Sequence, residues 1–155
     1  MIDNSVLDIF RNEFFWAAFC AWTAAQFTKM LCGFFKTKRF NFSYIVRLGG
    51  MPSAHSALVS ALAASVGLSV GFVGPVFAIT LALALIVMFD AATVRRAAGK
   101  QAQLLNEMVE EFFKEHRFSE KKLAELLGHT RLEVFLGMIM GVLVALLVHS
   151  FAVLY

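Results

Sequence analysis

Four long apolar segments constrain the fold of this chain more than any other feature of its sequence. They cover residues 14–35, 52–73, 74–90 and 132–155. A helix of about 17 to 25 mostly apolar residues is long enough to cross the hydrocarbon core of a bilayer. A soluble domain of 155 residues with 59% hydrophobic and 16% charged residues could not bury that much apolar surface. The sequence therefore excludes a soluble globular enzyme and a disordered chain. It predicts one all-α membrane domain over residues 1–155, a bundle of about four transmembrane helices.

One polar segment, residues 93–131, separates the third predicted span from the fourth. Apolar residues recur at helical spacing over residues 103–113, which predicts an amphipathic helix. A second short helix is expected within residues 119–128 because a serine and a glycine stand where its caps would lie. In the fourth span, Gly137 and Gly141 are four residues apart and predict close approach of a neighbouring helix.

Lys and Arg are concentrated in two of the three connections between the spans, and the tight second connection carries none. Because basic loops favour the cytoplasmic side, this bias places both basic connections in the cytoplasm and both termini outside, in an inner or plasma membrane. No stripe of interleaved basic and aromatic residues is present, so no nucleic-acid partner is expected. Cys20 and Cys32 lie in one apolar segment and are expected to be core residues. The sequence leaves open whether the protein forms a homo-oligomer.

Unusual polar residues gather at the basic end of the predicted bundle. Because consecutive spans alternate in direction, the end of one span and the start of the next lie at the same membrane face. The residues brought there are Lys29 in the first span, Gly49–Ser56 at the start of the second, Asp90, Arg95 and Arg96 after the third, and Gly128–Glu133 at the start of the fourth. This convergence predicts a polar site near one leaflet surface.

The segment before the second span has the features of an anion site. Gly50 permits a positive φ and close approach of the backbone to a ligand. Pro52 suits the first turn of a helix, whose free N–H groups favour an anion. Ser53 adds a hydroxyl, and His55 adds a proton donor near neutral pH. The alternative is a glycine loop and helix start with an incidental histidine.

His129 and Glu133 are four residues apart, so on a helix they lie one turn apart on the same face. A carboxylate on one imidazole nitrogen fixes the tautomer and makes the other nitrogen a nucleophile or base. The alternative is an ordinary capped helix start.

Cations complete the predicted site. Lys29 is costly inside a span unless it faces a polar cavity or extends to the interface. Arg95 and Arg96 can clamp a phosphate, and one of them can equally serve as a juxtamembrane anchor. Asp90 is expected to neutralise or orient one of these arginines.

These residues resemble the motifs of the type 2 phosphatidic acid phosphatase superfamily, which includes vanadium-dependent haloperoxidases. Pro52-Ser53-Ala54-His55 resembles its proline–serine–glycine–histidine motif, and His129-x-x-x-Glu133 resembles its histidine-x-x-x-aspartate element. The segments 49–56, 90–106 and 127–133 together are similar to a small divergent membrane branch of that superfamily.

The resemblance implies phosphoryl transfer without a metal or other cofactor. His129 would attack phosphorus, Glu133 would orient it, and His55 would protonate the leaving oxygen. Lys29 matches the lysine of the first motif, and Gly50, Ser53, Arg95, Arg96 and Asp90 would complete the binding site. Leu123 stands where the superfamily has an arginine, so Arg95 or Arg96 would supply that charge.

The sequence thus predicts a metal-independent phosphohydrolase that acts on a lipid phosphate or isoprenyl diphosphate, with membrane lipids around it. One rival is a non-enzymatic binder or transporter of phosphate-headed lipids, for which the His129–Glu133 pair is unnecessary. The other is a divalent-cation site built from His55, Asp90, His129 and Glu133, which the nearby cations disfavour.

Overall fold

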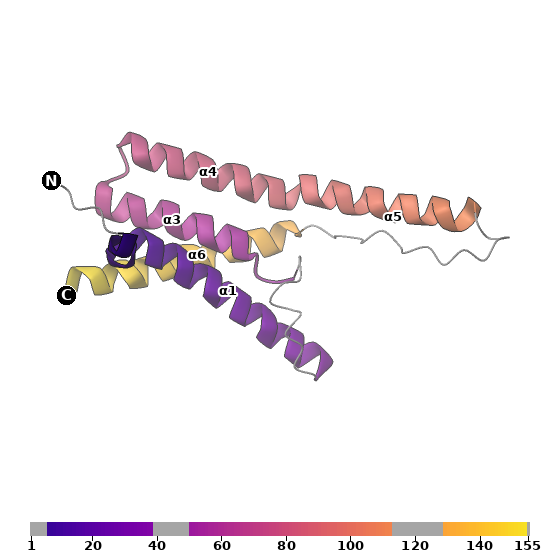
Figure 1. Cartoon of the computed structure of the whole chain (residues 1–155), viewed down its shortest axis with the longest axis horizontal. Coiled ribbons are helices and arrows are strands. Elements are labelled where there is room, and N and C mark those ends of the chain that lie inside the picture. The colour runs from indigo at the N-terminus through magenta and orange to yellow at the C-terminus, as the bar shows by residue number, and fades with distance from the viewer. Residues whose placement is uncertain (1–5, 39–49, 113–128, 155) are drawn as a thin grey trace.

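The computed structural model describes residues 6–38, 50–112 and 129–154. In this part of the chain all regular structure is helical (Figure 1). The elements are the 3-10 helix η1 (Val6–Arg11) and the α-helices α1 (Glu13–Thr37), α3 (Ala54–Val70), α4 (Pro75–Ala92), α5 (Val94–Phe112) and α6 (Arg131–Leu154). The predicted all-α class is confirmed.

Helix α3 lies at the centre of the bundle, where it packs against α1, α4 and α6 (Figure 1). Ala, Ser and Gly make up most of its buried residues, which include Ala57, Ser60 and Gly67. Such small side chains allow helix backbones to approach closely, and this contact is a main source of association where lipid replaces water. The composition of α3 therefore explains its central position.

Two glycines of α6 make the closest contact with α3. A Cβ atom added at Gly137 would collide with the carbonyl oxygen of Ser53, and one added at Gly141 would collide with the carbonyl oxygen of Ala57. The close approach predicted from these glycines is confirmed. It brings the start of α6 against the start of α3.

By length and composition, two helical stretches of the described chain can cross a membrane: Pro75–Val109, which joins α4 to most of α5, and α6. Helix α3 is apolar but has only 17 residues, and α1 carries Gln26 and Lys29. On α4 most of the large apolar side chains are exposed, and its buried residues are Ala84 and Ala91. An exposed apolar surface of this extent suits contact with lipid.

Two helices differ from the sequence-based boundaries. The second predicted span begins at residue 52, whereas α3 begins at Ala54 because Ser53 caps it with an extended backbone (φ −70°, ψ 115°). Pro52 therefore precedes the cap and is not in the first helical turn. Helix α5 is longer than the predicted amphipathic segment, and only Thr93 separates it from α4. The helix predicted within residues 119–128 lies outside the described residues.

Candidate functional site

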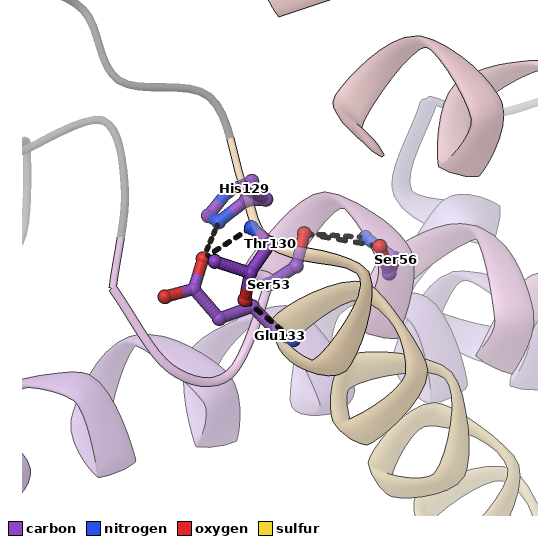
Figure 2. A network of polar contacts seen from close by, with 5 residues as sticks. All are labelled: Ser53, Ser56, His129, Thr130 and Glu133. Carbon is purple, nitrogen blue, oxygen red and sulfur yellow. Dashed lines mark hydrogen bonds and ion pairs between the residues drawn. The ribbon is translucent and has the colours of Figure 1, made fainter. Parts of the chain in front are cut away.

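A buried histidine–carboxylate pair lies at the start of α6 (Figure 2). His129 is buried, with a side chain that is 5% exposed, and its Nδ1 is 3.0 Å from Oε2 of Glu133. An ionised carboxylate only accepts hydrogen bonds, so Nδ1 carries the proton that it donates to Glu133. In the neutral imidazole this tautomer leaves the lone pair on Nε2. The geometry is that required of an oriented nucleophile or base.

The main chain holds the Glu133 carboxylate in place. The backbone N–H of Thr130 donates to Glu133 Oε2 at 3.0 Å, and the backbone N–H of Glu133 donates to Thr130 Oγ1 at 3.3 Å (Figure 2). These reciprocal bonds form a capping box, for which a threonine followed three residues later by a glutamate is the sequence signature. The role of Thr130 was not predicted, although this signature was readable. Glu133 therefore caps α6, as the alternative interpretation expects, and it also contacts His129, because the same oxygen, Oε2, takes part in both interactions.

Ser53 connects the start of α3 to the same turn of α6. Its backbone N–H donates to the carbonyl oxygen of Glu133 at 3.0 Å. The buried hydroxyl of Ser53 caps α3, because its Oγ accepts the backbone N–H of Ser56 at 3.4 Å (Figure 2). The Oγ of Ser56 lies 3.0 Å from the same atom. Substrate contact by Ser53 stays a prediction, and the position of Ser53 beside Glu133 is an observation.

Lys29 of α1 reaches the same region from inside the bundle. Its side chain is 6% exposed, and the charge of Glu133 acts on it electrostatically. Gly50 has a φ of +93°, and a Cβ added there would lie 3.4 Å from Cγ of Lys29. The glycine thus permits both the turn and close contact with the lysine stem. Burial of Lys29 favours the polar-site interpretation over a side chain that extends to the interface.

The other predicted residues belong to the first turn of α3, the last turn of α4 and the first turn of α5. His55 is exposed in the first turn of α3, two residues after Ser53, and Asp90 is half-buried in the last turn of α4. Arg95 and Arg96 belong to the first turn of α5, but their side chains lie outside the described part of the structure. The structure brings together Lys29, Gly50, Ser53, His129 and Glu133 from three helices and their flanking turns.

The rival metal site is not assembled by the described residues. Among them, no three His, Cys, Asp or Glu side chains lie close enough together to hold a metal ion. The set of His55, Asp90, His129 and Glu133 is part of that search, so these four residues do not form such a group.

Comparison with known proteins identifies the family of this chain. A family model described as the divergent PAP2 family, where PAP2 denotes type 2 phosphatidic acid phosphatase, matches residues 10–144. The chain belongs to the divergent PAP2 family. A Bacillus subtilis (strain 168) protein, "Uncharacterized membrane protein YuiD", is 39% identical over 141 residues, which cover 82% of this chain and 87% of that protein. No solved structure matches.

Membership of the divergent PAP2 family confirms the resemblance found in the sequence. The match spans α1, α3, α4 and α5 and ends within α6, so it includes every candidate site residue. In this divergent PAP2 chain, the His129–Glu133 pair lies in a membrane protein whose superfamily is related to phosphatases.

Proposed function

We propose that the protein is a metal-independent membrane phosphohydrolase that acts on a lipid phosphate or an isoprenyl diphosphate. The observation that carries this proposal is the 3.0 Å contact between Nδ1 of buried His129 and Oε2 of Glu133. Binding alone does not require a histidine with a fixed tautomer, whereas nucleophilic attack does.

In this mechanism Nε2 of His129 attacks phosphorus and the bond from phosphorus to the leaving oxygen breaks. Glu133 stabilises the imidazolium character that develops on His129, as the acid of a catalytic triad does. His55 supplies the proton that the leaving oxygen takes. Water then attacks the phosphohistidine and gives a proton to His55; the bond from phosphorus to Nε2 breaks, which releases inorganic phosphate and restores both histidines.

The charge needed to hold a phosphate comes from the same end of the bundle. Lys29 is buried beside Gly50, and the charge of Glu133 attracts its ammonium. Arg95 and Arg96 enter the proposal from the sequence, as the bidentate donors that phosphate recognition favours. Asp90 is proposed to orient one of them, and the backbone at Gly50 and Ser53 to approach the phosphate.

A lipid substrate is favoured because a site between helices near one membrane surface receives molecules from the bilayer. The exposed apolar side chains of α4 and α6 support contact of this bundle with lipid. The cytoplasmic orientation of the site is proposed from the basic connections alone.

The second candidate is a non-enzymatic binder or transporter of phosphate-headed lipids. It uses Lys29, the arginines and the start of α3, and it assigns no chemical role to the His129–Glu133 pair.

The test is phosphate release by the purified full chain from a panel of lipid phosphates and isoprenyl diphosphates, with and without EDTA. We expect release from at least one substrate, no loss with EDTA, and inhibition by vanadate, which adopts the five-coordinate geometry of phosphoryl transfer. Binding of the same lipids without release would favour the second candidate. Loss of activity in EDTA with restoration by a divalent cation would contradict the histidine mechanism.

A further inference from the structure

The opposite end of the bundle holds a pocket that the proposed reaction does not use. Its volume is about 520 Å³, and it lies between η1, the start of α1 and the end of α6. In Figure 1 this end carries both chain termini, whereas the His129 site lies at the other end of α6. The lining residues are Asp8, Arg11, Asn12, Glu13, Phe14 and Ala152.

The pocket contains side chains of opposite charge, and most of them are available to a ligand. In the described part of the chain, the side chains of Asp8 and Arg11 form no ion pair or hydrogen bond. Oε2 of Glu13 lies 3.7 Å from Nδ1 of His149, at one edge of the pocket. Two carboxylates and one guanidinium therefore line a single open depression of the surface. This arrangement suits a ligand that carries both a cationic and an anionic group.

Asn12 adds a hydrogen-bond donor to this set. Its Oδ1 accepts the backbone N–H groups of Phe14 at 2.9 Å and Phe15 at 3.2 Å, and so caps α1. Because the cap uses the oxygen, the amide nitrogen is the part of Asn12 that can donate to a ligand.

The surroundings of the pocket are those of a membrane interface. Ile9 and Phe10 of η1 expose 45% and 57% of their surface. Nε1 of Trp16 donates to the carbonyl oxygen of Phe10 at 2.7 Å, which ties η1 to α1. Aromatic rings at this level match the aromatic belt found where apolar spans meet lipid headgroups. The exposed apolar side chains beside the pocket are therefore suited to contact with acyl chains.

We propose that this pocket binds the headgroup of a zwitterionic phospholipid that carries a primary ammonium, of the phosphatidylethanolamine type. The ammonium lies between the carboxylates of Asp8 and Glu13, and the phosphate accepts from Arg11 and the Asn12 amide. A primary ammonium has three N–H donors for these carboxylates, whereas a quaternary ammonium has none. An anionic lipid without an ammonium offers the same phosphate to Arg11 but has no cation for the two carboxylates.

Native mass spectrometry of the full chain in detergent tests this proposal, with phosphatidylethanolamine, phosphatidylcholine and phosphatidylglycerol as matched probes. We expect the ethanolamine lipid to bind about three- to fivefold more tightly than the glycerol lipid, the size usual for solvent-accessible charge pairs. Asp8→Asn should remove most of this preference, and Arg11→Gln should weaken binding of the ethanolamine lipid and of the glycerol lipid. Lys100→Gln, at an exposed charge on α5, should change neither.

Three results would overturn the assignment. Equal binding of the ethanolamine and glycerol lipids by the unmodified chain is the first. Retention of the preference in Asp8→Asn is the second. The third is binding of soluble phosphorylethanolamine as tightly as the lipid, because the ligand would then not be a membrane component. None of these measurements depends on phosphate release, so the proposal fails or stands independently of the proposed hydrolysis.

Discussion

The two ends of the bundle each carry a contact between Nδ1 of a histidine and Oε2 of a glutamate, and the two contacts differ in distance, burial and the helices that they join. At one end, His129 and Glu133 belong to the same turn of chain, lie 3.0 Å apart, and have side chains that are 5% and 16% exposed. At the other end, His149 of α6 lies 3.7 Å from Glu13 of α1, and the two side chains are 26% and 27% exposed. The first contact is short and mostly buried, and the second is long and partly open to solvent.

The partners of each pair explain the difference. Glu133 is fixed by the backbone of Thr130, so its carboxylate has one position in which to orient His129. Nδ1 of His149 is shared with the Ser69 hydroxyl at 3.1 Å, so His149 links α1, α3 and α6 at the surface. Burial and a main-chain anchor, more than the presence of histidine and glutamate, make the first pair suitable for catalysis. Substitutions at both ends of the bundle test this contrast.

The largest effect is expected from His129→Ala. We expect it to abolish phosphate release while binding of lipid phosphate largely survives, because Lys29 and the start of α3 stay in place. The measurements are single-turnover phosphate release and lipid binding by the same protein sample. His149→Ala is the matched control and should retain turnover, since its side chain lies at the other end of α6. Full hydrolysis by His129→Ala would remove the basis for the nucleophile assignment.

Glu133→Gln should slow turnover by about 10²-fold or more, less than the roughly 10⁴-fold loss that follows the analogous change in a serine-protease triad. The neutral amide cannot stabilise an imidazolium, but its oxygen can still accept the Thr130 N–H, since glutamine also completes a capping box. The fold should therefore survive, as judged by circular dichroism and thermal unfolding. Glu107→Gln, at an exposed carboxylate on α5, is the control. Equal turnover in the two variants would show that Glu133 only caps α6.

Gly137→Ala tests whether close packing of α6 on α3 supports the first pair. The added Cβ collides with the carbonyl oxygen of Ser53, and we expect the free energy of unfolding to fall by about 1–3 kcal/mol, as for overpacked sites. The readout is the midpoint of unfolding in detergent. Gly74→Ala is the control because nothing lies within 4 Å of its added Cβ, and replacing this cap glycine should cost about 0.5 kcal/mol. Similar losses in both variants would count against a special contact at Gly137.

The smallest effect is expected from the second pair. His149→Ala should lower the free energy of unfolding by less than about 1 kcal/mol, the usual limit for partly exposed ion pairs. Unfolding curves of the variant and the unmodified chain at the same pH provide the comparison. A loss as large as that of Gly137→Ala would mean that the exposed pair holds the bundle together.

Sequence patterns predicted the helical class and the close approach at Gly137 and Gly141 because both depend on local composition. They also predicted that His129 and Glu133 lie one turn apart on a helical face. The two side chains are in contact, but His129 lies before the cap residue Thr130, so the contact is made across the start of α6 and not along one face of it. The sequence signature indicates that Thr130 and Glu133 form a capping box, but it does not show that the capping oxygen of Glu133 also accepts from His129, because His129 lies before the helix.

Contacts between helices were still harder to predict from the sequence. That Gly50 lies against Lys29, or that Ser53 donates to the carbonyl of Glu133, depends on how α1, α3 and α6 are rotated about their axes. The pocket between η1 and α6 could not be predicted for the same reason, since no sequence pattern indicates that η1 and the end of α6 lie side by side.

The hydrogen bond from Ser53 to Glu133 has a consequence for how this protein can change over time. It joins two backbone atoms, so a substitution that alters only a side chain at either position leaves both donor and acceptor in place. A lineage can therefore exchange the groups that perform chemistry while it inherits the frame that holds them. A glutamate where the superfamily motif has an aspartate, as at position 133, is a change of this kind, because the bond from Ser53 uses only the backbone carbonyl of that residue.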